Sequence, residues 1–474
     1  MTLQDVTINI TDGALGVLPA ETDKVILVLG TSSAGTPNTL YPVNSADALA
    51  TLGYGPGPET VKHFVDEGAL VYFMPVTAGT AGANTAVAQP SGTPPTVAVT
   101  GTPYDAYDAK VKMTLGGALG TAKFQYSLDG GETWSQDVIT AASYPIANTG
   151  LTLTFASGTY VLADTYTFTS TAPYYTTTNL NAAFDAAIAD SREWGLVYVA
   201  GTPAGATESD KATAIAGVIS AVGSKMSAAA TGYRFARAIV EAANFADSGA
   251  ALISAANSIA QTRVACVAGF GRVTSPLTGR KNLVNVGRVV CSKLGKKPIG
   301  KDPSQVLAEN GTGPLPSALL SLTHDERKTP GLDAARFVTA RTYVGRTGFY
   351  VTNFPLLSAP GSDYKYIQHG QIIDNASKVV RNALLNYLSR DLELNANGTL
   401  AEGQAQAIDE DVDGQVRASL VAPGHANDCT VTTNRTDDIL STEKLRAKVR
   451  VQPKAYPKTI EVELGFTKTV PVTT

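Results

Sequence analysis

The chain has 474 residues, a net charge of −4 and a mean hydropathy of +0.02, and these values exclude several classes of protein. The 37 basic and 41 acidic residues are spread along the chain, without the concentrated positive charge of a nucleic-acid binder. No stretch approaches the ~18 apolar residues of a membrane span, and the N-terminus lacks the pattern of a secretory signal. We therefore expect a soluble protein of about three domains.

Charged residues make up only 16% of the chain, below the roughly 25% that is typical of soluble domains. Two explanations are open. Neighbouring copies cover much of the surface in an assembly, or the fold needs few charges.

The three cysteines, Cys266, Cys291 and Cys429, are widely spaced and odd in number. They therefore predict neither a full set of disulfides within the chain nor a zinc site. Cys266 lies in a run that is typical of a buried strand. Cys291 and Cys429 lie in more polar surroundings, either as reduced thiols or as disulfides between subunits.

The chain begins with an extended arm and continues as an α/β domain. Residues 1–20 alternate weakly, with apolar positions at Val6, Ile8 and Ile10. Residues 24–30 form a nearly continuous apolar run, which is typical of a strand buried on both faces. Two helices and a second buried strand are expected at residues 45–52, 59–67 and 69–76. This order predicts a βαβ unit.

Residues 80–175 are rich in Thr, Gly, Pro and Tyr and show no helical periodicity. They contain short alternating runs, at residues 96–100, 109–114, 123–128, 151–155 and 165–169. Asp129-Gly130-Gly131 is a tight-turn signal after one of these runs. We predict a small all-β sandwich inserted into a loop of the α/β domain.

Alternation of helices and strands returns after this segment, beginning with a helix that carries Leu180, Phe184 and Ile188 on one face. Buried strands are expected at residues 195–200, 235–241 and 263–269, with helices between them. Repeated strand–helix alternation predicts a parallel sheet with helices on both faces.

The order of elements changes after residue 365. Helices are expected at residues 372–394 and 401–420, followed by strand-like runs at residues 428–433, 447–452 and 459–464. This pattern predicts an α+β C-terminal domain. Residues 467–474 are extended and have no partner in their own neighbourhood, so both ends of the chain are predicted to be arms.

Motifs for nucleotide or calcium binding are incomplete. The loop from Gly30 to Gly35 has the glycine spacing of a P-loop, but Thr36 stands where the lysine is needed and Pro37 follows, so we predict a plain turn. Asp409 to Gly414 resembles the start of an EF-hand loop, but its twelfth position is Leu420. The apolar residues Ile408, Val412, Val416 and Leu420 instead predict a helix whose carboxylates face solvent.

The remaining polar residues do not predict an active site. The four histidines, His63, His324, His369 and His425, are far apart, and His324 is expected at the surface. No GxSxG motif is present. We therefore predict no catalytic residue, no metal site and no cofactor. Four lysines form a modest basic cluster: Lys293, Lys296, Lys297 and Lys301. This cluster is either an ordinary solvated stretch or a patch that faces an acidic partner surface.

The order of elements resembles the contractile tail sheath proteins of bacteriophages and related injection machines. The early strand and loop (residues 25–39), the second strand (68–76) and the start of the helix at Ile372 follow that family's pattern. The segments Leu332-Asp333-Ala334-Ala335-Arg336-Phe337, Arg341-Thr342-Tyr343 and Gly348-Phe349-Tyr350-Val351-Thr352-Asn353 carry the resemblance further. Residues 124–135 are similar to insertion domains of some sheaths.

The resemblance implies a subtilisin-like α/β domain without a catalytic triad. It divides the chain into an N-terminal arm (1–20), a sheath domain (21–79 and 176–365), the inserted domain (80–175) and the C-terminal domain (366–474). In this family the arms add strands to the sheets of neighbouring subunits. We assign the arms to residues 2–10 and 459–472, with Val6, Ile8, Ile10, Ile460, Val462, Leu464 and Phe466 as the contacting side chains.

The function implied by the resemblance is that of a structural subunit of a contractile phage tail sheath, not of an enzyme. The expected partners are further copies in a helical tube, an inner tail tube, and baseplate and tail terminator proteins, in a virion tail assembled in the host cytoplasm. No nucleic-acid binding or membrane insertion is expected. The lysine cluster would face the tube, and Cys291 and Cys429 could form disulfides between subunits.

Two alternatives stay open. The first is an α/β hydrolase or a nucleotide-binding enzyme with an appended β module. The second is the sheath of a related bacterial contractile injection system.

Overall fold

The structure is a computed structural model that describes residues 24–43, 46–201, 205–245, 249–307 and 313–466. The chain divides into two compact units, Met1–Arg381 and Asn382–Thr474. The division into four parts that the sequence suggests stays a prediction.

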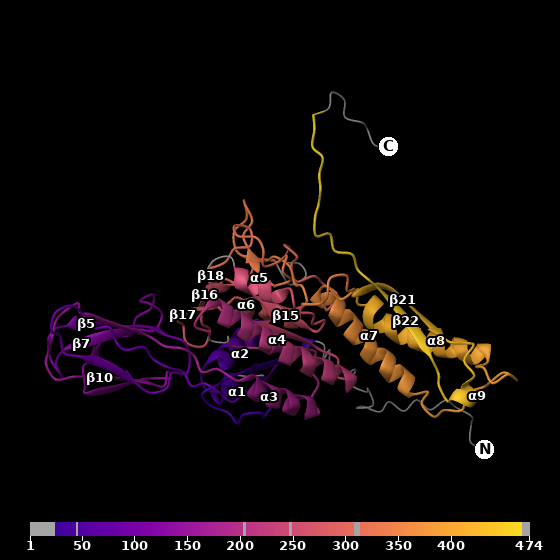
Figure 1. Ribbon diagram of the computed structural model, residues 1–474, viewed down its shortest axis with the longest axis horizontal. Helices are drawn as coiled ribbons and strands as arrows, with labels where there is room; N and C mark the ends of the chain where they lie inside the picture. Colours follow the sequence, from indigo (N-terminus) through magenta and orange to yellow (C-terminus); the bar gives the residue numbers. More distant parts are fainter. Residues whose placement is uncertain (1–23, 44–45, 202–204, 246–248, 308–312, 467–474) are drawn as a thin grey trace, which may run out of the picture. The chain divides into compact units, whose positions relative to one another are not determined.

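A six-stranded sheet lies at the centre of the first unit (Figure 1). Its strands are, in spatial order, β15 (Val264–Val267), β14 (Arg237–Glu241), β13 (Leu196–Val199), β1 (Ile26–Gly30), β3 (Val71–Pro75) and β2 (Tyr41–Val43). All neighbours pair in parallel except β2, which runs antiparallel to β3 at the edge. The parallel sheet predicted from the sequence is confirmed, and β2 is an addition to it.

Helices cover both faces of this sheet, as predicted. One face carries α3 (Thr177–Ala189), α4 (Glu208–Thr231) and α5 (Ala250–Ala256), and the other carries α1 (Ala46–Ala50), α2 (Pro56–Asp66) and α6 (Gly287–Val290). Side chains alternate along a strand, so Leu27 and Leu29 join the core under α3 and α4, whereas Ile26 and Val28 join the core under α2. Both faces are covered, which explains why all five residues of β1 are buried.

Helix α4 is long and apolar enough to cross a membrane by length and composition alone. However, 44% of its apolar stretch is buried inside the fold. Ile215, Ile219 and Met226 are fully buried on the face toward the sheet. Its N-terminus has a capping box between Thr207 and Asp210. These features are typical of a core helix in a globular domain.

Between β3 and α3 the chain forms two antiparallel sheets that share one hydrophobic core. The first sheet contains β4 (Val97–Thr100), β10 (Leu151–Phe155) and β9 (Ser143–Ile146), and the second contains β12 (Thr165–Thr169), β5 (Asp108–Leu115), β7 (Lys123–Ser127) and β8 (Val138–Ile139). A short pair, β6 (Gly117–Ala118) and β11 (Thr159–Tyr160), joins them. Phe124 from one sheet packs against Phe155 from the other, with ring centroids 4.7 Å apart. This inserted segment has the layers of a β-sandwich.

The rest of the first unit consists of smaller sheets, short helical turns and loops. A three-stranded antiparallel sheet contains β17 (Lys281–Asn285), β16 (Phe270–Thr274) and β18 (Leu319–Leu322). The 3-10 turn η2 covers Cys291–Lys296, and β19 (Ala340–Arg341) pairs with β20 (Tyr350–Val351). The loop after β1 leads to β2 and not into a helix, so it lacks the strand–loop–helix geometry of a phosphate-binding loop.

Helix α7 (Ile367–Leu385) ends nine residues before the predicted position 394. Ser389 takes a left-handed backbone conformation with φ of 58° just beyond it, which does not continue a helix. In the second unit, α8 (Glu402–Val416) continues into a π turn, η4 (Arg417–Val421). The hairpin of β21 (Ala426–Thr433) and β22 (Ala447–Pro453) follows, with α9 (Ile439–Thr442) in its connection.

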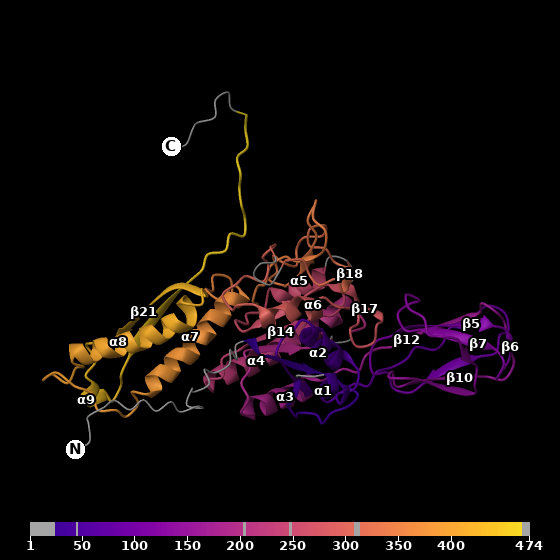
Figure 2. The same ribbon diagram turned by 180° about the vertical axis from the view of Figure 1, so that it is seen from behind.

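The helix predicted from Ile408, Val412, Val416 and Leu420 is confirmed, since all four are completely buried. The expectation that its carboxylates face solvent holds for Glu410, which is exposed, but not for Asp409, which is partly buried. Asp409 accepts hydrogen bonds from the backbone and hydroxyl of Thr433 in β21, because α8 lies directly along this strand (Figure 2).

Two further expectations need correction. The third C-terminal strand, predicted at residues 459–464, is not formed: among the described residues no strand follows Pro453. Alternation makes a strand only where the segment pairs with another strand, and residues 459–464 pair with none among the described residues. The predicted surface position of His324 was also wrong, because its side chain is buried and its Nε2 lies 2.8 Å from Glu326 Oε2.

Candidate assembly surfaces

The second unit contains a two-stranded sheet with two outer edges. In the described part of the chain, β21 and β22 pair only with each other. Ala426, Cys429 and Thr433 of β21 are buried toward α8, which fixes the hairpin on the helix. An unpaired strand edge exposes N–H and C=O groups that another strand can satisfy. The two edges differ in how well they are covered.

Side chains from the α8–η4 helix cover the outer edge of β21. Arg417 donates to the carbonyl of Cys429 at 2.6 Å, and Asp409 accepts from the N–H of Thr433 at 2.6 Å. These charged side chains occupy backbone groups that a further strand would need. The edge of β21 is therefore a poor acceptor.

On β22 the cover among the described residues is limited to the end of the strand, where Asn427 Nδ2 donates to the carbonyl of Pro453 at 3.3 Å. Its side chains alternate: Val449 and Val451 are half-buried, whereas Lys448 and Arg450 are exposed. Neither basic side chain has an ion pair among the described residues. Residues 428–430 of β21 and 450–453 of β22 together line a shallow groove on the hairpin. β22 therefore presents an open backbone edge with an apolar side and a basic side.

The described part of the C-terminal arm leaves this hairpin as an extended segment (Figure 1). Its apolar side chains are each at least 78% exposed: Ile460, Val462, Leu464 and Phe466. Glu461 and Glu463 alternate with them, are also exposed, and have no ion pair among the described residues. The arm therefore has one apolar side and one acidic side. These match the apolar side and the basic side of β22.

The N-terminal arm residues Val6, Ile8 and Ile10 lie outside the described residues. Their assignment as contacting side chains stays a prediction.

The cysteines are free thiols, and all three are buried. Burial raises the pKa of Cys291 well above its ordinary value and that of Cys429 to about 11. A disulfide between subunits needs a sulfur that a second chain can reach. The predicted disulfides at Cys291 and Cys429 stay a prediction, and they would require these side chains to become exposed.

The lysine cluster does not consist of exposed side chains alone. Lys293 is half-buried, burial lowers its pKa, and it donates to the carbonyl of Pro314 at 2.6 Å. Lys297 is only 3% exposed, and Lys301 is partly buried. The side chain of Lys296 lies outside the described part of the structure. A tube-facing role for this cluster stays a prediction.

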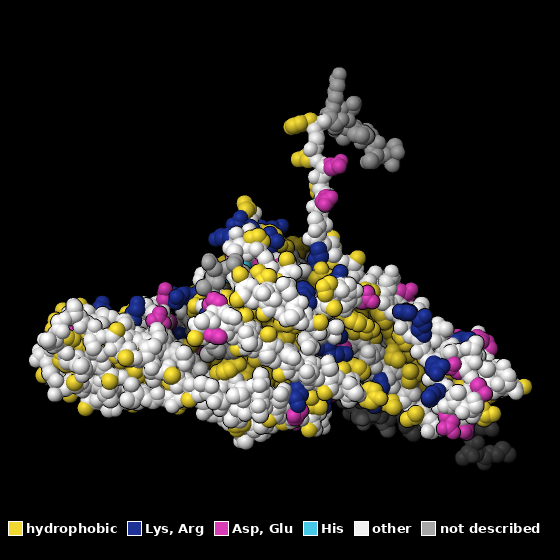
Figure 3. Space-filling model, viewed as in Figure 1, with side chains coloured by type: hydrophobic (Ala, Val, Ile, Leu, Met, Phe, Trp, Pro, Cys, Tyr) yellow, Lys and Arg dark blue, Asp and Glu magenta, His cyan; other side chains and the backbone are white. Residues whose placement is uncertain are grey.

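Figure 3 shows Lys and Arg side chains gathered on a projection of the first unit. The exposed basic residues of this unit include Arg327, Lys328 and Arg346, which lie on two loops joined by hydrogen bonds. Buried Asp325 joins the loops, since it accepts hydrogen bonds from the hydroxyl and backbone of Thr342 at 2.5 and 3.0 Å. Sequence spacing did not reveal this surface, because its residues come from loops that meet only in the fold.

No group of three or more His, Cys, Asp or Glu side chains within the described ranges could hold a metal ion. His63, His324, His369 and His425 come from different elements of the chain and do not form a cluster there. The charged groups that are buried serve to fix helices and loops, as Asp374 does by binding Arg237 and Arg263.

Two protein-family models match most of the chain. The family described as DUF2586, N-terminal domain, matches residues 3–355, and the one described as DUF2586, C-terminal domain, matches residues 363–470. No curated protein sequence matches the chain.

Several solved structures share the fold. Cryo-EM structures of the anti-feeding prophage are similar over nearly the whole chain. The baseplate in its contracted state has a TM-score of 0.56 and 15% identity, with 98% of each chain covered. The helical sheath in its contracted state has a TM-score of 0.52 and 12% identity, with 99% of this chain and 100% of that chain covered. The sixfold symmetrised baseplate has a TM-score of 0.53, with 12% identity and the same coverage.

Proposed function

Because the chain belongs to the DUF2586 family and has the fold of sheath and baseplate proteins of a contractile particle, we propose that it is a structural subunit of a contractile sheath. Identical copies would form a helical tube around an inner tube and contract to drive that tube forward. In the form predicted from the sequence, the sheath belongs to a bacteriophage tail and drives the tail tube through the host envelope. The proposal assigns no chemical reaction to the chain.

The observation that carries this proposal is the complementarity between the C-terminal arm and β22. Paired as neighbouring strands of two copies, Ile460 and Val462 would lie on the side of Val449 and Val451. Glu461 and Glu463 would then lie beside Lys448 and Arg450. Strand addition satisfies backbone groups along the edge, and each opposite-charge pair across strands contributes about 0.2–1 kcal/mol.

Such a contact is made between different surfaces of the two partners, so it does not close on itself as a symmetric dimer does. Repetition of a contact of this kind gives a ring or an open helix. The arms would keep subunits linked while their rigid parts repack. Contraction then requires only a difference in interface free energy between two packings of the same fold, with a barrier holding the first packing.

A charge swap tests the strand donation. Glu461→Lys/Glu463→Lys and Lys448→Glu/Arg450→Glu each place like charges side by side, so each pair of substitutions is expected to reduce tube formation in negative-stain electron microscopy. Combining all four restores opposite charges and is expected to restore tubes. Light scattering at matched protein concentration gives the extent of assembly.

Glu443→Lys/Lys444→Glu provides the matched control, because these exposed residues precede β22 and do not lie in it. This variant is expected to assemble normally. If both charge-reversed variants form tubes as well as the unchanged protein, or if the fourfold variant assembles no better than either, β22 is not the acceptor. If the unchanged protein stays monomeric at high concentration, the sheath proposal itself is wrong.

The sheath of a bacterial contractile injection system is the second candidate. It is favoured by the origin of the three solved structures described above, which all come from the anti-feeding prophage. Electron microscopy of particles that contain this chain would separate the two. DNA-filled heads on the sheathed tails support the phage, and headless sheathed particles support the injection system.

A further inference from the structure

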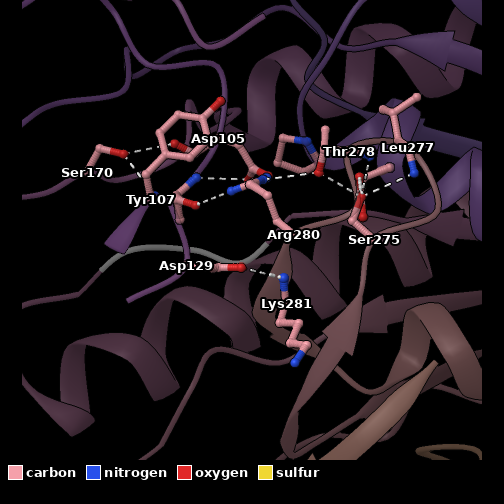
Figure 4. Close-up of polar contacts among 12 residues, drawn as sticks. Asp105, Tyr107, Asp129, Ser170, Ser275, Leu277, Thr278, Arg280 and Lys281 are labelled. Carbon is pink, nitrogen blue, oxygen red and sulfur yellow. Dashed lines mark hydrogen bonds and ion pairs between the residues drawn. The ribbon is translucent and has the colours of Figure 1, made fainter. Parts of the chain in front are cut away.

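The inserted β domain is attached to the α/β core by more than its two connecting segments. The turn between β16 and β17 belongs to the core, and Arg280 projects from it toward the inserted domain (Figure 4). Arg280 Nη2 lies 2.7 Å from Asp105 Oδ2, and Nη1 donates to the carbonyl of Ala106 at 3.3 Å. Both charged side chains are largely buried, at 8% and 11% exposure.

On the inserted side, Arg280 contacts the loop between β4 and β5, and this loop is bonded to the segment that leaves the domain after β12. The guanidinium of Arg280 lies 4.6 Å from the ring centre of Tyr107. The N–H of Tyr107 donates to the hydroxyl of Ser170 at 2.9 Å, and that hydroxyl donates to the carbonyl of Asp105 at 3.1 Å. Arg280 therefore binds a loop of the inserted domain that is itself fixed to the segment leading back to the core.

On the core side, hydrogen bonds continue from Arg280 to helix α2. Arg280 Nε donates to Thr278 Oγ1 at 3.1 Å, and Thr278 and Ser275 share a hydrogen bond of 2.9 Å. Ser275 Oγ donates to Glu59 Oε2 at 2.8 Å. Glu59 is a buried residue of α2, which packs directly against β1 and β3. The inserted domain is thus connected to the centre of the fold.

A second contact prevents rotation about the first. The N–H of Lys281 donates to Asp129 Oδ2 at 3.0 Å. The same carboxylate fixes the tight turn after β7, since it accepts from the N–H and hydroxyl of Thr133 at 2.9 and 2.7 Å. Two separate attachment points define an orientation, whereas one alone would leave a pivot.

We propose that Arg280 and Asp105 are positioning residues that lock the inserted β domain onto the α/β core, so that the two move as one rigid body. Separating the domains would leave a guanidinium and a carboxylate without partners in a largely buried junction, which is strongly unfavourable. The inference goes beyond the sheath proposal and does not depend on it. Within a contractile sheath it means that the inserted domain turns together with the core.

Distance measurement between spin labels tests the joint in the isolated full chain. Labels at Leu70→Cys in the core and Ile139→Cys in the inserted domain occupy exposed positions, while the three native cysteines are buried. One narrow distance distribution is expected. Arg280→Ala and Asp105→Asn are each expected to broaden it, because they remove the ion pair but not the connecting segments.

Lys225→Ala is the control, since it removes an ion pair with Asp185 that is remote from the joint, and it is expected to leave the distribution narrow. A broad distribution in the parent protein overturns the proposal. So does an unchanged distribution in folded Arg280→Ala and Asp105→Asn variants.

Hydrogen exchange of the unsubstituted chain gives a second readout if the variants do not fold. The amide of Lys281 is expected to exchange as slowly as those of the core strands, because it donates across the joint to Asp129. Exchange as fast as that of exposed loop amides would contradict a rigid joint.

Discussion

Buried polar residues in the first unit hold backbone segments in place through their hydrogen bonds. Glu326 shows this arrangement. One of its carboxylate oxygens accepts from the N–H groups of Gly331 and Asp333, at 2.7 and 3.1 Å, and the other lies against His324. The cost of burying these groups is offset by their hydrogen bonds, and the result is a loop held in one conformation.

His63 is the residue from which we expect a measurable pH effect. Burial in α2, together with the nearby charges of Arg288 and Lys62, lowers its pKa to about 3, and its Nε2 lies 3.8 Å from Glu59. The unfolded chain protonates His63 near its ordinary pKa, but the folded chain does not. Its contribution to stability is therefore complete above about pH 6.5 and is lost as the pH falls toward 3.

Replacing His63 by Leu removes this proton-linked loss. Between pH 7 and pH 5 the parent protein is expected to lose about 2 kcal/mol more unfolding free energy than His63→Leu. Urea unfolding at the two pH values measures the difference. Parallel losses in the two proteins would show that His63 is protonated in the folded state. Comparing pH 8 with pH 7, where little difference is expected, provides the control.

At the scale of single elements, the spacing of apolar residues in α8 decides whether its acidic segment is a calcium-binding loop or a helix. Its acidic run is part of a helix, and the carboxylates hold neighbouring elements. Tyr387 donates to Asp411, and Arg417 pairs with Asp413. A calcium loop would need these oxygens to converge on one point, whereas a helix directs them to different sides.

We therefore expect Ile408→Ala to reduce the unfolding free energy by about 2–5 kcal/mol, because it leaves a cavity under α8. Glu410→Ala, at an exposed position of the same helix, should change it by less than about 0.5 kcal/mol. Addition of calcium is expected to leave the melting temperature unchanged. A rise in melting temperature with calcium that is lost in Asp409→Asn would contradict the helical interpretation.

At the scale of the whole molecule, the proposed sheath gives the C-terminal arm a role in assembly and not in the folding of its own subunit. The described part of the arm forms no strand and its apolar side chains are exposed, so the arm adds little to the stability of its own subunit. In the proposed sheath, its apolar surface would be buried only against a neighbour. In that sheath, the stability of the subunit and the stability of the assembly would depend on different residues.

Deleting residues 459–474 is expected to abolish tubes and to leave a folded, soluble monomer. Negative-stain electron microscopy measures the first effect, and thermal unfolding, with an unchanged midpoint, measures the second. Full-length protein at the same concentration is the control. Normal polymerisation of the truncated chain would show that this arm is not required for assembly.

Much of the fold follows from local sequence patterns, because the periods of helix and strand are properties of neighbouring residues. The buried runs of β1 and β13, the apolar stripe of α4 and the exposed, alternating C-terminal arm all belong to this class. The boundaries were less predictable: α7 ends at Leu385 because of a turn, and residues 459–464 form no strand because no edge in their own unit pairs with them.

The tertiary structure alone decided which distant residues meet. Arg280 contacts Asp105 across 175 positions of sequence, Asp409 reaches Thr433 of β21, and His324 is buried although its neighbours in sequence are charged. Such contacts depend on how elements pack, and no spacing along the chain records that packing. The sequence by itself determined most of the buried strands, the main helices and the alternation of the C-terminal arm. The fold decided which edge of the hairpin is left open and which core side chains reach the inserted domain.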